Sequence, residues 1–118
     1  MRAAIEAINQ TFERALEKGV TIGMGTDAAV YPHGRNTEEF YMMSRLGMSA
    51  LQALRAGTSV DAELLGISKT IGTLEPGKLA DIIVMPGDPA REIRNAEKVF
   101  FVMKEGVIYR NDRAKSGI

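Results

Sequence analysis

The stretch Val20-Thr21-Ile22-Gly23-Met24-Gly25-Thr26-Asp27 decides the fold. Its first five residues are mainly β-branched or apolar, and an apolar run bounded by glycine predicts a short strand that is buried on both faces. Strands of this kind belong to parallel sheets, in which each neighbour is reached through a crossover of a dozen or more residues. If residues 20–24 form such a strand, helices and further strands are expected before and after them in the sequence.

Helices are predicted on both sides of this strand. Apolar residues recur every three or four positions over residues 2–18, and a glycine follows. After a loop over residues 25–36, capping patterns at Asn36 and Ser49 predict two further helices, and a third short helix is predicted over residues 60–65. A helix, a single glycine and an apolar strand follow one another in this way in α/β proteins.

The character of the chain changes after about residue 70. Glu75-Pro76-Gly77-Lys78 predicts a type II turn, because proline suits the second position and glycine the left-handed third. A strand is predicted over residues 79–85 and a β-hairpin over residues 98–109. The sequence offers no obvious parallel neighbour for residues 20–24, which indicates that part of their sheet is missing. The alternative is one small α+β sheet in which residues 20–24 pair with the C-terminal strands.

Composition excludes several classes of function. The 118 residues suffice for one domain or less. Lys+Arg and Asp+Glu both total 15, so no basic surface for nucleic acid or an anionic membrane is expected. The absence of cysteine removes disulfides, thiolate metal sites and cysteine nucleophiles. No apolar run is long enough to cross a membrane, and a cytoplasmic location is the expectation.

Asp27 and His33 are the candidate site residues. Asp27 follows the predicted strand directly, where barrel enzymes place catalytic groups, although an aspartate after a strand is more often a turn or capping residue. His33 is the only histidine, in the loop Tyr31-Pro32-His33-Gly34. It could touch substrate or metal, and an exposed loop histidine is the ordinary alternative.

Five motifs, taken in order, resemble the C-terminal end of the amidohydrolase superfamily, nearest to its imidazolonepropionase-like and Xaa-Pro dipeptidase-like branch. They are Gly25-Thr26-Asp27, Pro32-His33-Gly34, Met48–Leu54, Ala62–Gly66 and, most specific, Gly72-Thr73-Leu74-Glu75-Pro76-Gly77-Lys78-Leu79-Ala80-Asp81. The resemblance implies an α/β fold: the C-terminal part of a (β/α)8 barrel, with its last strand and helices, plus returning strands of a small β-sandwich domain. Residues 1–69 would belong to the barrel, residues 70–110 to the sandwich, and residues 111–118 would form a flexible tail.

The resemblance also implies a chemistry. The parent protein would be a metal-dependent hydrolase acting on C–N bonds of small amide or dipeptide-like substrates. Asp27 would approach a divalent metal, with zinc as the expected ion, and would accept a proton from water and return it to the departing nitrogen. His33 would contact the substrate. The family's other ligands, which include a His-x-His pair and two further histidines, are not in this sequence. Because catalytic zinc normally takes three protein ligands, we expect the chain alone to be inactive.

Two other interpretations stay open. One is a non-catalytic α+β interaction module that kept the scaffold and lost the site. The other is a subunit completed by another chain that supplies the missing strands. A missing barrel segment or a second copy of the chain is the expected macromolecular partner, because exposed strand edges favour association.

Overall fold

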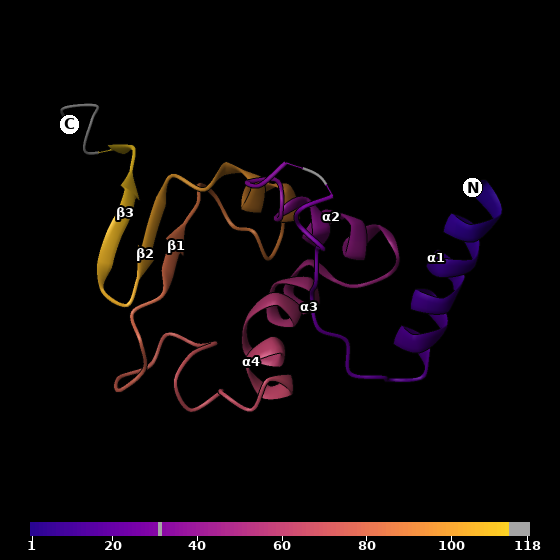
Figure 1. Cartoon of the computed structure of the whole chain (residues 1–118), viewed down its shortest axis with the longest axis horizontal. Coiled ribbons are helices and arrows are strands. Elements are labelled where there is room, and N and C mark those ends of the chain that lie inside the picture. Colours follow the sequence, from indigo (N-terminus) through magenta and orange to yellow (C-terminus); the bar gives the residue numbers. More distant parts are fainter. Residues whose placement is uncertain (31, 114–118) are drawn as a thin grey trace.

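The structure is a computed structural model that describes residues 1–30 and 32–113. Helices form the middle and one end of the molecule, and a small sheet forms the other end (Figure 1). None of the helices in the described residues is long and apolar enough to cross a membrane. The elements in chain order are α1 (Arg2–Glu17), α2 (Glu38–Arg45), α3 (Ala50–Arg55), the π-helical segment η1 (Ala56–Val60), α4 (Asp61–Leu64), β1 (Ile82–Val84), the 3-10 helix η2 (Ile93–Lys98), β2 (Phe101–Lys104) and β3 (Val107–Asn111).

One continuous helix runs through α3, η1 and α4, where the sequence predicts two separate helices. Its start follows the predicted capping box: Ser49 Oγ accepts the Gln52 amide at 3.2 Å, and Gln52 Oε1 accepts the Ser49 amide at 2.8 Å. The π-helical turn of η1 carries the helix across Gly57-Thr58-Ser59. π-Helical turns of this kind occur mostly inside α-helices and often near functional sites.

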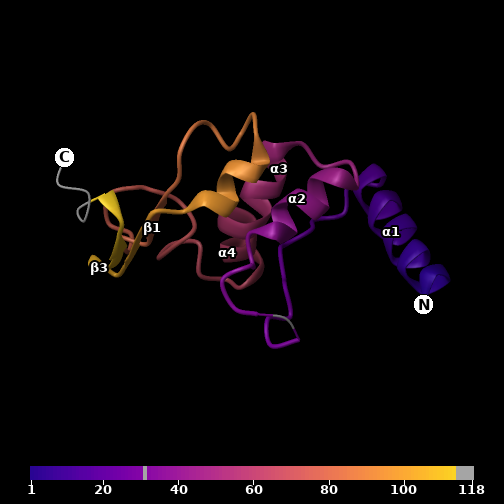
Figure 2. The same cartoon turned by 90° about the horizontal axis from the view of Figure 1, so that it is seen from above.

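The core lies between α2, the continuous helix and η2. Alanines on α3 and η1 allow α2 to pack closely against this helix, and η2 packs against α2. The buried cluster is Phe40, Met43, Met48, Ala53, Ala56, Ile93 and Ala96. Helix α1 stands to one side (Figures 1 and 2). It contributes the half-buried Phe12 and Leu16, while Ile5 and Ile8 are exposed.

A three-stranded antiparallel sheet with the order β1-β2-β3 forms the C-terminal part of the described chain. The predicted hairpin is present and turns at Glu105-Gly106, where both residues have positive φ angles, 51° and 80°. Two left-handed residues between antiparallel strands match the right-handed twist of a hairpin. The predicted turn at Glu75-Pro76-Gly77-Lys78 is also present, with Gly77 at φ 90° and the Lys78 amide on the Glu75 carbonyl at 3.2 Å.

The strand predicted over residues 20–24 is not formed. These residues lie outside the sheet, and no other strand in the described part of the chain pairs with them. The alternative, in which they pair with the C-terminal strands, is also wrong. Among the described strands, β1 and β3 each pair only with β2, and none pairs with residues 20–24. The strand predicted over residues 79–85 is shortened to Ile82–Val84. Asn111 of the predicted tail ends β3, and residues 114–118 lie outside the described residues.

Candidate functional site

Asp27 lies on the surface, just beyond residues 20–24. Its backbone is left-handed, with φ at 47°, a conformation that few residues other than glycine adopt. Its carbonyl accepts the Val30 amide at 3.3 Å and so closes a turn. Within residues 1–30 and 32–113 the exposed carboxylate has no hydrogen-bond or ion-pair partner. Asp27 therefore neither caps a helix nor enters the core, and its carboxylate is available to a ligand.

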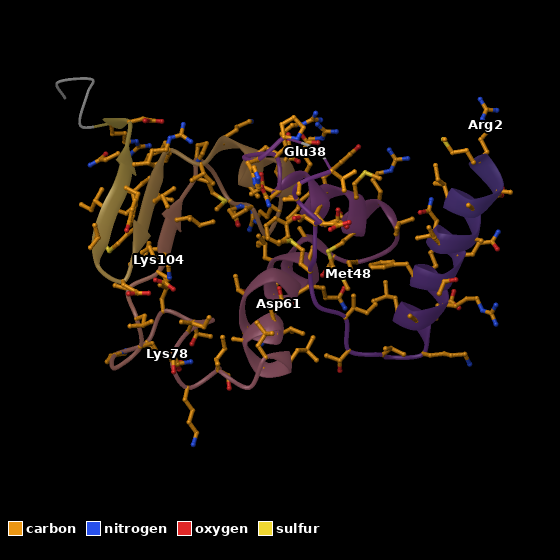
Figure 3. The ribbon with its side chains drawn as sticks, in the orientation of Figure 1. Arg2, Glu38, Met48, Asp61, Lys78 and Lys104 are labelled. Carbon is orange, nitrogen blue, oxygen red and sulfur yellow. The ribbon has the colours of Figure 1, made fainter. Side chains whose placement is uncertain are left out.

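Asp61 holds the segment that leads to Asp27 against the continuous helix. The Met24 amide donates to Asp61 Oδ1 at 3.0 Å, across 37 positions of sequence. Asp61 is the first residue of α4 and lies in the middle of the molecule (Figure 3). Gly23 passes so close that a Cβ there would lie 2.2 Å from Asp61 Oδ1. A glycine within an apolar run can mark such an approach, so Gly23 was the sequence signal for this contact.

Asn36 connects the turn of Asp27 with the turn of His33. Its Nδ2 donates to Thr26 Oγ1 at 3.2 Å, and its Oδ1 accepts the Gly34 amide at 3.2 Å. Thr26 precedes Asp27 and Gly34 follows the exposed His33, so one carboxamide joins the turns that carry both candidates. The prediction that Asn36 caps the next helix is wrong: Thr37 occupies that position, and the Asn36 side chain bonds within the loop instead.

The two glutamates at the start of α2 have different surroundings. Glu38 pairs with Arg35, whose Nη2 lies 2.8 Å from Glu38 Oε2, and these hydrogen bonds lower the pKa of the Glu38 carboxyl. Glu39 is half-buried, and burial raises the pKa of its carboxyl. Glu38 is labelled in Figure 3. Glu38 carries the carboxylate nearest in sequence to Asp27 and His33, and this carboxylate is already paired with Arg35.

Comparison with known proteins places this arrangement in a family. The sequence model described as "Amidohydrolase family" matches residues 6–110. The chain belongs to the amidohydrolase family. This confirms the family that the motifs resemble, and members of this family are generally metal-dependent.

Solved and curated relatives agree with this assignment. The amidohydrolase chain is 44% identical to a Xaa-Pro dipeptidase crystallised with methionine in its active site, with a TM-score of 0.84, over 88% of this chain and 26% of that one. It is 29% identical to ochratoxinase from Aspergillus niger, over 93% of this chain and 24% of the relative. It is 32% identical to guanine deaminase from Escherichia coli (strain K12), over 78% of this chain and 23% of the relative. The chain thus spans about a quarter of the length of these relatives.

The described residues of this amidohydrolase chain do not by themselves fit a metal ion. They contain no group of three His, Cys, Asp or Glu side chains that could hold one. Asp27 and His33 would offer one carboxylate and one imidazole, which is fewer than the three protein ligands usual for catalytic zinc. The described residues alone are therefore too few to hold a catalytic metal.

A cavity of about 460 Å³ lies between α4 and β1. Its lining is mostly apolar, with Leu65, Ile71, Leu79 and Ile83 among the residues, and Asp61 borders it. Neither Asp27 nor His33 lines this cavity. It is therefore separate from the two turns that carry the candidate site residues.

Proposed function

We propose that this chain supplies the proton-transferring carboxylate, Asp27, of a metal-dependent hydrolase that cleaves C–N bonds in small amide or dipeptide-like substrates. The observation that carries the proposal is the exposed, unpaired carboxylate on a left-handed residue directly after the apolar segment, within the described residues. Left-handed backbone at a residue other than glycine often occurs at functional sites. The 44% identity to a Xaa-Pro dipeptidase favours dipeptide-like substrates.

Asp27 acts first as a base and then as an acid in this proposal. It takes a proton from the attacking water and later gives it to the departing nitrogen. Asparagine would fill the same volume but could not carry the proton. His33 lies on the turn joined to Asp27 through Asn36, and we assign it to substrate contact. The divalent metal, expected to be zinc, would be held mainly by groups outside this segment, with Asp27 adding one carboxylate oxygen.

Replacing Asp27 by asparagine tests this assignment. In the protein that carries this segment, Asp27→Asn should lower kcat for Xaa-Pro dipeptides or acyl amides by about 10²- to 10⁴-fold, the usual contribution of general acid–base catalysis. The unfolding midpoint should not change, because the Asp27 side chain is exposed. The matched control is Glu13→Gln, which neutralises an exposed carboxylate elsewhere in the chain, in α1. Near-normal turnover of Asp27→Asn would remove the proton-transfer role.

A second candidate function, a subunit completed by barrel strands of another polypeptide, is favoured by the exposed surface. The chain exposes 8607 Å², whereas a compact monomer of this mass exposes roughly 6,300 Å². An interface that buried this excess of roughly 2,300 Å² and a similar area on the partner would total about 4,600 Å², within the range of obligate interfaces. Mixing the chain with the complementary N-terminal part of an amidohydrolase barrel should give a one-to-one complex in sedimentation velocity and turnover that neither part has. Two species that sediment independently would contradict this candidate.

A further inference from the structure

We propose that Asn36 is a positioning residue that holds the Asp27 turn and the His33 turn in one fixed arrangement. Its catalytic meaning rests on the proposed function, whereas its structural part concerns only the order of the loop. Both polar ends of one carboxamide are used: the nitrogen bonds Thr26 Oγ1, ten positions earlier, and the oxygen bonds the Gly34 amide. A side chain that served only its own turn would not reach across the loop to Thr26.

The loop requires such a connection because regular structure is absent from its described residues. No strand pairing fixes residues 20–24, and the described residues between Glu17 and Glu38 form no helix. The turn closed by the Val30 amide and the Asp27 carbonyl, at 3.3 Å, is held by a long hydrogen bond. The left-handed φ of 47° at Asp27 is moreover uncommon at residues other than glycine, although aspartate tolerates it better than most. Restraints from outside the turn would help to select this conformation.

Asn36 is placed to transmit such a restraint from α2. Its own carbonyl accepts the Glu39 amide at 3.2 Å, so its backbone continues the first turn of α2. Met43 of α2 is buried in the core cluster, which makes α2 a rigid support. On the other side of the turn, the Met24 amide is fixed by Asp61 at 3.0 Å. Thr26 and Met24 flank Gly25, so the two restraints together determine where the chain delivers Asp27.

The contact requires a polar side chain at position 36 that reaches both partners. Aspartate would keep the acceptor for the Gly34 amide, and its second oxygen would accept from the Thr26 hydroxyl, so it would reverse the direction of the bond to Thr26 without removing it. Alanine would lose both. The Thr26 hydroxyl can accept this bond, and serine at the same position would preserve it, whereas valine has the same shape without the acceptor. These differences define a matched set of variants at positions 26 and 36.

Amide hydrogen exchange of the 118-residue protein, read by NMR at Met24 and Val30, tests the proposal. Asn36→Ala and Thr26→Val should each speed exchange of the Val30 amide roughly fivefold, the factor that corresponds to one neutral hydrogen bond. Thr26→Ser should leave it unchanged. Thr37→Ala is the control, because the Thr37 side chain makes no capping hydrogen bond. The double variant Thr26→Val/Asn36→Ala should be no faster than Asn36→Ala alone, since the contact that Thr26→Val removes is already lost in Asn36→Ala.

Unchanged Val30 exchange in both Asn36→Ala and Thr26→Val would overturn the proposal, as would an equal effect of Thr37→Ala. If Asn36→Ala lost the fold, seen as lost protection at Ala53, Thr26→Val would decide, because it leaves the start of α2 intact. Failure of the proposed function is distinguishable: Asp27→Asn would then retain turnover while Asn36→Ala still loosened the turn. If both hold, Thr26→Val, which removes only the bond beside Asp27, should lower kcat with little change in KM, and Thr26→Ser should keep kcat.

Discussion

The substitution Gly23→Ala tests how the segment before Asp27 is held to the continuous helix. A Cβ at position 23 would lie 2.2 Å from Asp61 Oδ1 and 2.9 Å from Leu64 Cδ1. At Gly25, in the same segment, a Cβ would meet nothing within 4 Å. Neither glycine has a positive φ angle, so alanine is compatible with both backbones. Comparing the two variants isolates the contact with Asp61.

The magnitude follows from what Asp61 must give up. Its carboxylate relieves the overlap by turning away, and it then releases the Met24 amide. A hydrogen bond to a charged group contributes about 1.5–3 kcal/mol. Replacing glycine by alanine recovers about 0.4–1 kcal/mol of unfolded-chain entropy at either position. We therefore expect Gly23→Ala to be about 1.5–3 kcal/mol less stable than Gly25→Ala, and Gly25→Ala to be no less stable than the unsubstituted chain.

Urea denaturation followed by far-UV circular dichroism measures the difference. The same pair of substitutions should then be compared in an Asp61→Ala background. There the Met24 bond is already lost and the oxygen atom that meets the new Cβ is gone, so the difference should fall below about 1 kcal/mol. Equal stabilities of Gly23→Ala and Gly25→Ala would refute the reasoning. So would a difference of the same size with and without Asp61.

Three further predictions concern the site and its surroundings. Isothermal titration of the chain with zinc should show weak binding, because its described residues hold no three-ligand group; one tight zinc ion per chain would contradict this. His33→Ala should change kcat or KM of the active protein, and unchanged values for both would make His33 an ordinary loop residue. Burial raises the pKa of Glu39, so its contribution to stability falls as pH rises above its ordinary value of 4.5. Glu39→Gln should therefore raise the urea midpoint at about pH 7 but not at about pH 3, and an equal gain at both would exclude this cause.

The features predicted correctly from sequence are those that neighbouring residues determine. The capping box depends on Ser49 and Gln52 alone, and both of its hydrogen bonds are present. The turn at Gly77 and the hairpin at Gly106 depend on glycines that adopt positive φ. Helix α1 follows its apolar spacing within one residue of the predicted end. Local chemistry fixes each of these regardless of what the rest of the chain does.

The features that sequence reasoning missed depend on contacts between distant residues. The apolar run at 20–24 has the composition of a strand, but a strand also requires a partner, and its described surroundings provide none. The helix continues through Gly57, where the sequence suggested a break. The glycine leaves room for Phe40 to pack against the helix, since a Cβ there would lie 2.7 Å from the ring. The role of Asn36 was hidden because asparagine before a helix ordinarily indicates a cap. Only the folded position of Thr26 reveals that the Asn36 carboxamide also donates a hydrogen bond to this distant residue.

The missing strand pairing and the two side-chain restraints are connected. In a parallel sheet, ladder hydrogen bonds would fix residues 20–24 along their length. In this structure, Asp61 supplies a restraint at the last of these residues, Met24. Asp27 lies beyond the end of that segment, where a ladder would not reach even if neighbouring strands were present. The contact of Asn36 with Thr26 acts at that distal point, so its effect on Asp27 should persist in any assembly that completes the sheet.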